Sequence, residues 1–209
     1  MLAEMIVDIA IEPSPPIDHD CGKCSICIDR CPTGAIVAPY TVDTPKCLSF
    51  QTIEQRGAIP LHLRASTGDW VFGCDVCQDV CPYTTAARRS FDQDFQPRHL
   101  DNAFPRLHWL LQVSEEDFRA FFQGTAVLRA KRRGMARNAA VAVGNHQDPD
   151  SIPILIDALL GHDEPLVRGH AAWALGCFDG SRPAVALDQA RITERDDQVL
   201  AEIQQALDR

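Results

Sequence analysis

The sequence lacks the features that mark membrane proteins, secreted proteins and histidine-based metal sites. No apolar run approaches the ~20 residues that a transmembrane helix needs. Residues 1–11 are apolar, but they include Glu4 and Asp8 and no basic residue, unlike a signal peptide. The seven histidines are scattered, with no spacing typical of metal ligands. These absences predict a cytoplasmic protein with no membrane partner.

Positive charge is also scarce. The 209 residues include 20 Lys and Arg against 29 Asp and Glu, which gives a formal net charge of −9. Such a chain has no overall attraction to nucleic acid or to an anionic membrane. Apolar residues make up 45% of the sequence and charged residues 23%, so a folded core is expected. The length suits one ordinary domain or two small ones.

Cysteine is the residue present in excess. Eight of the nine cysteines lie within residues 21–85, among Pro, Gly and Asp, so regular elements there should be short. Thiols stay reduced in the cytoplasm, and clustered cysteines therefore indicate metal or redox chemistry rather than disulfides. The ninth, Cys177, lies beside Phe178 and is expected to be a small core residue.

The cysteine spacing predicts two [4Fe–4S] clusters. The run from Cys21 to Pro32 has the form Cys-x2-Cys-x2-Cys-x3-Cys-Pro, in which the fourth cysteine binds the other cluster. A second run, Cys74 to Pro82, lacks its first cysteine, and Cys47 can replace it. The predicted ligands are Cys21, Cys24, Cys27 and Cys81 for the first cluster, and Cys31, Cys47, Cys74 and Cys77 for the second. Two zinc sites of four thiolates each are the alternative, but zinc ribbons do not need the x3-Cys-Pro ending.

The sequence from residue 129 onward predicts a helical repeat. The pattern Ala139-Ala140-x-Ala142-x-Gly144 recurs as Ala171-Ala172-x-Ala174-x-Gly176, and an amphipathic stretch, Ile152 to Leu160, separates the two copies. Helix pairs with such a period are typical of HEAT-like solenoids. Breaks are expected at Gly144-Asn145, Gly161-His162-Asp163 and Asp179-Gly180.

These patterns predict a mainly α protein in which a ferredoxin-like two-cluster domain precedes a short HEAT-like repeat domain. The expected boundaries are 1–20 for a remnant of an N-terminal domain with its Pro-rich linker, 21–85 for the cluster domain, 86–128 for a helical connector and 129–209 for the repeats. Within the connector, Ser114 followed by three acidic residues predicts a helix start. The repeats are expected to pack on the cluster domain.

Several of these motifs together resemble the epoxyqueuosine reductase family, and the resemblance covers nearly the whole chain. The contexts of Cys47 and Cys74 are more specific than a ferredoxin motif alone. The residues that carry the resemblance are Cys31-Pro32-Thr33-Gly34-Ala35-Ile36, Cys47-Leu48-Ser49-Phe50-Gln51-Thr52-Ile53-Glu54, Gly73-Cys74-Asp75-Val76-Cys77-Gln78, Arg137-Asn138-Ala139-Ala140 and Ala171-Ala172-Trp173-Ala174-Leu175-Gly176.

The resemblance implies an oxidoreductase that reduces epoxyqueuosine to queuosine in tRNA, with two clusters passing electrons to cobalamin. It also implies an electron-donor protein. Family members carry a cobalamin-binding domain before the cysteine domain, so this chain is expected to represent the C-terminal portion, and a separate cobalamin-binding polypeptide is a possible partner. The resemblance places the catalytic acid in that domain, so no residue of this chain is assigned as the acid. Ser49, Thr52 and Asp75 are predicted to lie near the corrin; the alternative for Ser49 and Thr52 is cluster tuning or helix capping.

A short basic run interrupts the acidic sequence. Five cations fall within the nine residues from Arg129 to Arg137. Phosphate binding favours such local density, and Arg contacts phosphate in a bidentate way. A solvated helix face is the alternative, but the family's repeat domain contacts tRNA. The predicted tRNA-binding residues are Lys131, Arg132, Arg133, Arg137, Asn138 and, in the second repeat, Arg168.

Two other functions stay open on the sequence alone. One is a stand-alone diferredoxin-type electron carrier without tRNA binding, which predicts redox activity and no affinity for nucleic acid. The other is an interaction module whose clusters are structural.

Overall fold

The structure is a computed structural model that describes residues 4–16, 20–87, 90–93 and 96–209. The predicted N-terminal remnant, 1–20, lies partly outside these residues. Its described part, residues 4–16, has no helix or strand and is exposed along its whole length.

The cysteine-rich part consists of short elements, as its Pro and Gly content predicts. Two strands form an antiparallel pair, joined through Tyr40 at a φ of 60°. The elements are α1 (Ile26–Arg30), β1 (Ile36–Ala38), β2 (Thr41–Val42), the 3₁₀ turn η1 (Thr44–Lys46), α2 (Leu48–Ile53), α3 (Leu61–Thr67), α4 (Val76–Asp79) and α5 (Pro82–Ala86). Helices α1 and α4, which come from the two cysteine runs, pack against each other.

The connecting segment holds α6 (Leu100–Ala103), α7 (Leu107–Gln112), α8 (Glu115–Phe121) and the 3₁₀ turn η3 (Ala126–Arg129). Ser114 caps α8, because its Oγ accepts the Asp117 N–H at 3.0 Å, which confirms the predicted helix start. Aromatic rings hold this segment together: the Phe118 and Phe122 centroids are 5.0 Å apart, and Trp109 lies 4.7 Å from Phe121.

The repeat part is a stack of helices. It comprises α9 (Lys131–His146), the 3₁₀ turn η4 (Pro149–Ser151), α10 (Ile152–Gly161), α11 (Pro165–Leu175), α12 (Ser181–Thr193) and α13 (Asp197–Leu207). The breaks predicted near residues 161–163 and 179–180 are confirmed. The break predicted at Gly144-Asn145 was wrong, because α9 continues to His146 and ends at Gln147, whose φ is 54°.

Close helix packing explains why a glycine stands inside α9. A Cβ on Gly144 would lie 2.8 Å from the Trp173 ring and 2.9 Å from the Ala174 Cα on α11. Gly176, its counterpart in the repeat, would meet Ala206 of α13 at 2.8 Å. Both glycines therefore mark helix crossings, Gly144 inside α9 and Gly176 at the C-cap of α11.

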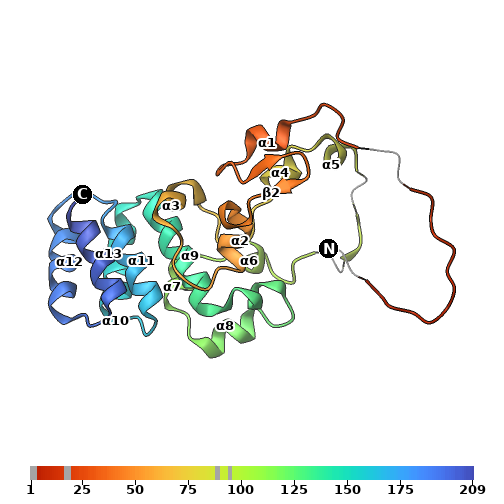
Figure 1. The fold of residues 1–209 in the computed structure, drawn as a ribbon. Helices are drawn as coiled ribbons and strands as arrows, with labels where there is room; N and C mark the ends of the chain where they lie inside the picture. Colours follow the sequence, from red (N-terminus) through yellow and green to blue (C-terminus); the bar gives the residue numbers. More distant parts are fainter. Residues whose placement is uncertain (1–3, 17–19, 88–89, 94–95) are drawn as a thin grey trace.

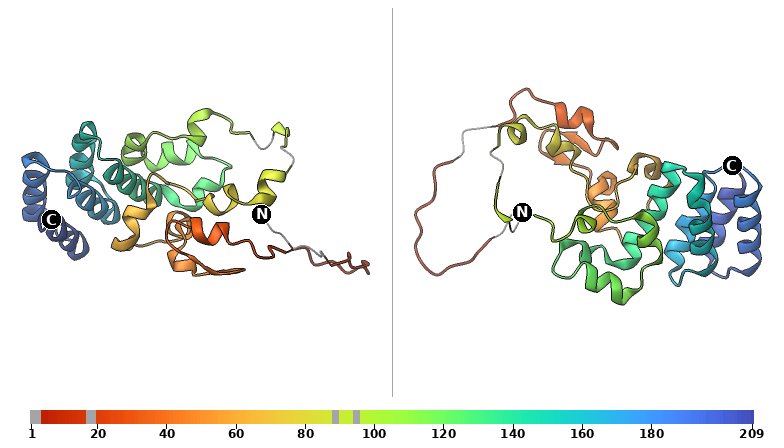
Figure 2. Two further views of the ribbon diagram at one scale, coloured as in Figure 1. Left: turned by 90° about the horizontal axis from the view of Figure 1, so that it is seen from above. Right: turned by 180° about the vertical axis from the view of Figure 1, so that it is seen from behind.

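The parts lie in a row, with the cysteine runs at one end, α2, α3 and α7–α9 in the middle, and α10–α13 at the other end (Figure 1). Two further views show the same order (Figure 2). Helix α9 packs against both α2 and α3, so the repeats dock on the cysteine-rich part as expected. Within the described part of the chain, no helix combines the length and apolarity that crossing a membrane requires.

Three polar contacts fasten this junction. Arg64 of α3 is 2% exposed and forms a two-pronged ion pair with Glu202 of α13, 2.7 Å on one side. His170 of α11 accepts the Ile59 N–H at 3.2 Å through Nε2. Asn145 of α9 donates to the carbonyls at residues 64 and 68, both at 2.8 Å. The chain thus closes contacts between segments more than 75 residues apart.

Candidate functional site: a cysteine cluster beside the helical repeats

Each predicted ligand sits at the start or end of a short helix or in the loop before it. Cys31 follows α1, Cys47 is the N-cap of α2, and Cys81 is the N-cap of α5. All nine cysteines carry free thiols. Short elements with thiols at their ends expose sulfur atoms to a shared space, which a long helix or strand would hide.

Electrostatic coupling shows which thiols lie near one another. Burial raises the pKa of Cys74, and the neighbouring thiolates of Cys47 and Cys31 raise it further. Burial also raises the pKa of Cys77, with contributions from Cys74, Cys47 and Cys27. These contributions link Cys74 with Cys47 and Cys31, and Cys77 with Cys74 and Cys47, which are thiols from three separate segments that the sequence assigns to the second cluster.

Cys31 has polar groups around its sulfur. The Ala35 N–H donates to its Sγ at 3.2 Å, and the Thr33 Oγ1 lies 3.8 Å away. Burial would raise the Cys31 pKa, but hydrogen bonds from backbone N–H groups, including those of Thr33, Ile36 and Ala35, outweigh it and lower the pKa. A thiolate that is stabilised in this way is prepared for metal ligation.

The donor set fits iron–sulfur clusters. Thiolates are the usual ligands of [4Fe–4S] clusters, and backbone N–H donors to sulfur are one of the means by which proteins tune them. Among the residues that the structure describes, no three Cys, His, Asp or Glu side chains gather tightly around a single ion position.

Thr52, predicted near a corrin, is instead enclosed between α2 and the loop before Cys74. It is 0% exposed, its Oγ1 donates to the Leu48 carbonyl at 2.8 Å, and it accepts the Gly73 N–H at 3.0 Å. A side chain buried in this way does not fit direct contact with a cofactor. Its hydrogen bond to Gly73, next to Cys74, fits the alternative role of tuning the cluster. Ser49 is half-buried and Asp75 is exposed at the start of α4, so their proposed contacts stay predictions.

The basic run divides into exposed and paired residues. Lys131 is exposed and Arg133 is half-buried, and within the described residues neither has an acidic partner. Arg132 is nearly buried and pairs with Asp163 at 2.5 Å. Arg168 pairs with Glu194 at 2.7 Å. Lys131 and Arg133 are therefore the exposed or half-buried cations of the predicted set that have no acidic partner among the described residues.

Arg137 and Asn138 require a correction. Both are 0% exposed, although the sequence suggested a surface role in tRNA contact. They lie on the side of α9 that faces α2, and their polar atoms are occupied by backbone groups of the cysteine-rich part. Charge density along the chain predicted a basic face, but the helix turns these two residues inward.

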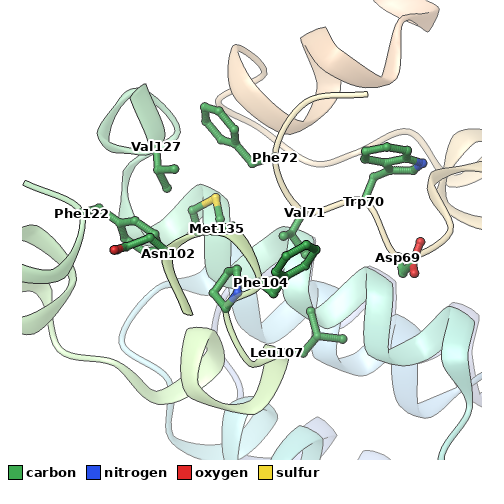
Figure 3. Close-up of a pocket in the computed structure, with 12 residues that line it drawn as sticks. Asp69, Trp70, Val71, Phe72, Asn102, Phe104, Leu107, Phe122, Val127 and Met135 are labelled. Atoms are coloured by element: carbon green, nitrogen blue, oxygen red, sulfur yellow. The ribbon is translucent and has the colours of Figure 1, made fainter. Parts of the chain in front are cut away.

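An apolar cavity that the sequence did not predict lies beside the loop leading to Cys74. Its volume is about 680 Å³, and side chains from that loop, from α6, α7 and α9, and from the segments between them surround it (Figure 3). Trp70, Phe72 and Phe104 supply aromatic walls, and Met135 lies across from them. The only signal in the sequence was the irregular spacing of aromatic residues.

Comparison with known proteins identifies two families in the chain. Residues 20–84 match the 4Fe-4S double cluster binding domain, and residues 125–208 match HEAT repeats. These matches confirm the predicted fold class, a mainly α protein with an iron–sulfur domain followed by HEAT-like repeats.

Whole-chain comparisons point the same way. The chain is 47% identical to an epoxyqueuosine reductase of Pseudomonas aeruginosa, and the match covers 83% of this chain and 48% of that protein. It is 33% identical to the Bacillus subtilis epoxyqueuosine reductase, covering 99% of this chain and 53% of that one. An uncharacterized protein of Geobacillus stearothermophilus, 35% identical, matches 97% of this chain over 93% of its own length.

A solved structure extends the likeness to three dimensions. The crystal structure of an epoxyqueuosine reductase with an epoxyqueuosine-modified tRNA-Tyr stem loop superposes with a TM-score of 0.89 at 32% identity. The match covers 94% of this chain and 52% of that one. The chain thus spans about half the length of the curated reductases that it matches.

Proposed function

The chain belongs to the epoxyqueuosine reductase family, and from this membership we propose that it is the iron–sulfur and tRNA-contacting portion of an enzyme that reduces epoxyqueuosine to queuosine in tRNA. The observation that carries the proposal is the convergence of Cys31, Cys47, Cys74 and Cys77 in a fold that matches a reductase bound to its modified stem loop. Free thiols also suit the reducing cytoplasm, where we place the protein.

The seven cysteines of the two runs, together with Cys47, are proposed to hold two neighbouring clusters. Cys21, Cys24, Cys27 and Cys81 would hold the first, and the converging set the second. Coupling between Cys27 and Cys77 supports this arrangement, because it joins a ligand of one cluster to a ligand of the other. When bound, the clusters supply one-electron transfer along the chain.

The chain's own residues would orient the ligands and exclude water. The Ala35 N–H holds the Cys31 sulfur, and Thr52 fixes Gly73 beside Cys74. Reduction of an epoxide to an alkene takes up electrons and protons and releases water, so a donor protein must feed electrons from outside. By family resemblance, cobalamin supplies the chemistry at the epoxide when it is bound. Ser49 and Asp75 are the residues here that we propose near it.

The proposed tRNA contacts are the free cations at the start of α9. Lys131 is exposed, and its backbone φ of 64° lies in the left-handed region that non-glycine residues rarely adopt. Arg133 follows on the same helix. Because Arg132 and Arg168 already have carboxylate partners, we expect them to add less to phosphate binding.

Cluster assignment is tested by iron and sulfide analysis of the anaerobically reconstituted chain. Cys47→Ser is expected to halve the bound iron, because it removes one ligand of the second cluster only. Cys177→Ser, at the one cysteine that is not a predicted ligand, is the matched control and should leave iron content unchanged. Equal iron in the Cys47→Ser and wild-type chains would contradict the assignment.

Substrate binding is tested with an epoxyqueuosine-modified stem loop by fluorescence anisotropy at several salt concentrations. Replacing Lys131 and Arg133 by Ala should weaken binding and reduce the slope of log affinity against log salt by about 1–2. Arg182→Ala, on α12, is the control. Turnover is then measured by mass spectrometry after adding cobalamin and a low-potential reductant. Redox-active clusters without stem-loop binding at low salt would favour the stand-alone electron carrier instead.

A further inference from the structure

Two buried side chains of α9 bind only main-chain atoms of the cysteine-rich part and each other. The guanidinium of Arg137 donates to the carbonyls of Gln51 at 2.6 Å, Gln55 at 2.8 Å and Gly57 at 2.6 Å. Its Nε and Nη2 also donate to the Oδ1 of Asn138, at 3.0 and 2.8 Å. The guanidinium therefore makes five hydrogen bonds, all of them to neutral oxygen atoms, which is more than side-chain packing alone requires.

Asn138 joins the two segments that carry the middle ligands. Its Nδ2 donates to the Thr52 carbonyl at 2.8 Å and to the Val71 carbonyl at 2.7 Å. Thr52 belongs to α2, which begins just after Cys47, and Val71 lies three residues before Cys74. One side chain of the repeat part therefore links helix α2, which follows Cys47, to the loop that precedes Cys74.

The charge of Arg137 is the second observation. Two other buried arginines near this junction have carboxylate partners: Arg64 has Glu202, and Arg132 has Asp163. Among the residues that the structure describes, Arg137 has no such partner. Burial first, and then nearby arginines, lower its pKa to about 10, so it stays a cation at neutral pH. An unpaired buried charge is costly, and a negative charge on a bound group nearby would offset that cost.

A cluster bound by four thiolates is an anion, and reduction makes it more negative. Gln51, which accepts from Arg137, donates its own N–H to the Cys47 carbonyl at 3.0 Å. At a rise of about 1.5 Å per residue, the guanidinium lies on the order of 10 Å from Cys47. Salt screens a buried charge at that range only weakly. The fixed cation therefore favours the reduced, more negative form.

We propose that Arg137 and Asn138 are positioning residues for the second cluster: Asn138 sets the spacing of the Cys47 and Cys74 loops, and the buried cation of Arg137 raises the cluster's reduction potential. The inference rests on the proposed cluster assignment and adds to it a role for the repeat part. The HEAT-like repeats then contribute to electron transfer as well as to tRNA contact.

The test is a redox titration of the reconstituted full chain, followed by electron paramagnetic resonance. Arg137→Gln removes the charge and keeps amide donors, whereas Arg137→Lys keeps the charge. The reduction potential of the second cluster should become more negative in Arg137→Gln and stay near the wild-type value in Arg137→Lys. The reduction potential of the first cluster should not change in either variant. The double variant Arg64→Met with Glu202→Met is the control, because it removes a neutral ion pair from the same junction.

Asn138→Leu gives a second, independent readout. It should speed the release of about half of the iron to a chelator, because only one of two clusters loses its support. Equal potentials in the wild-type, Arg137→Gln and Arg137→Lys chains would overturn the role of the cation, and unchanged iron release in Asn138→Leu would overturn the role of the amide. A wild-type chain that binds no cluster through Cys47 and Cys74 would overturn the proposed function itself, and this inference with it.

Discussion

Gly144→Ala tests the reason that a glycine interrupts the alanine-rich face of α9. The added methyl group would lie 2.8 Å from the Trp173 Cζ3 and 2.9 Å from both the Cα and the Cβ of Ala174. Carbon atoms in contact prefer about 3.5–4.0 Å, so the overlap is about 0.7 Å. Trp173 cannot turn away freely, because it is 5% exposed and Arg64 stacks on its ring at 5.5 Å.

The expected cost follows from two opposed effects. Overpacking in a core costs about 1–3 kcal/mol. Alanine in place of glycine inside a helix returns up to about 1 kcal/mol. Because part of the contact is with backbone that moves only if α9 and α11 separate, we expect a net loss of about 1–2 kcal/mol. For a chain of this length that lowers the thermal midpoint by roughly 2–8 °C.

The assay is thermal unfolding followed by circular dichroism under anaerobic conditions. Gly134→Ala, in the same helix, is the matched control: its new methyl group would lie 3.7 Å from the Ala130 Cβ, an ordinary contact, so the midpoint should rise. Gly176→Ala should behave like Gly144→Ala, because it meets Ala206 at 2.8 Å. A Gly144→Ala midpoint at or above that of Gly134→Ala would refute the close approach of α9 and α11.

Three further predictions concern buried charge. Arg64→Ala leaves the Glu202 carboxylate without its buried partner and should lower the free energy of unfolding by about 3–5 kcal/mol, measured by urea denaturation. The Arg168 hydrogen bond lowers the pKa of Glu194 to about 2 from 4.5, so the stability that this pair contributes should be lost as pH falls from 4.5 toward 2. The difference in thermal midpoint between the wild type and Glu194→Gln should shrink over that pH range. A constant difference would contradict the pairing. Burial, and secondarily Arg64, hold the pKa of His170 well below 6.5, so below pH 6.5 the unfolded chain binds a proton that the folded chain does not bind. The free energy of unfolding should therefore fall as pH drops below 6.5. If His170→Asn left the slope of this free energy against pH unchanged, the result would count against this prediction.

Cysteine spacing and the alanine-glycine repeat are local properties of the chain. The sequence alone therefore predicted both the iron–sulfur ligation and the helical repeats. Iron–sulfur ligation depends on gaps of two or three residues, which a short turn spans wherever it lies in the protein. HEAT-like helices depend on periodic small and apolar residues, which are likewise visible along the chain. The fold class and the family could therefore be predicted, as could the start of α8 at Ser114.

Burial and direction depend on contacts between distant segments, and only the tertiary structure decided them. Arg137 and Asn138 belong to a basic run in the sequence, yet α9 turns them toward α2, where backbone carbonyls need donors. Thr52 was predicted from its motif to lie near the corrin, but it is enclosed by the loop at Gly73. Gly144 looks like a helix end but permits a helix crossing. The sequence shows which residue carries a charge, a hydroxyl group or no side chain. The neighbours that give each of these residues its role come from distant parts of the chain, so only the folded structure shows them.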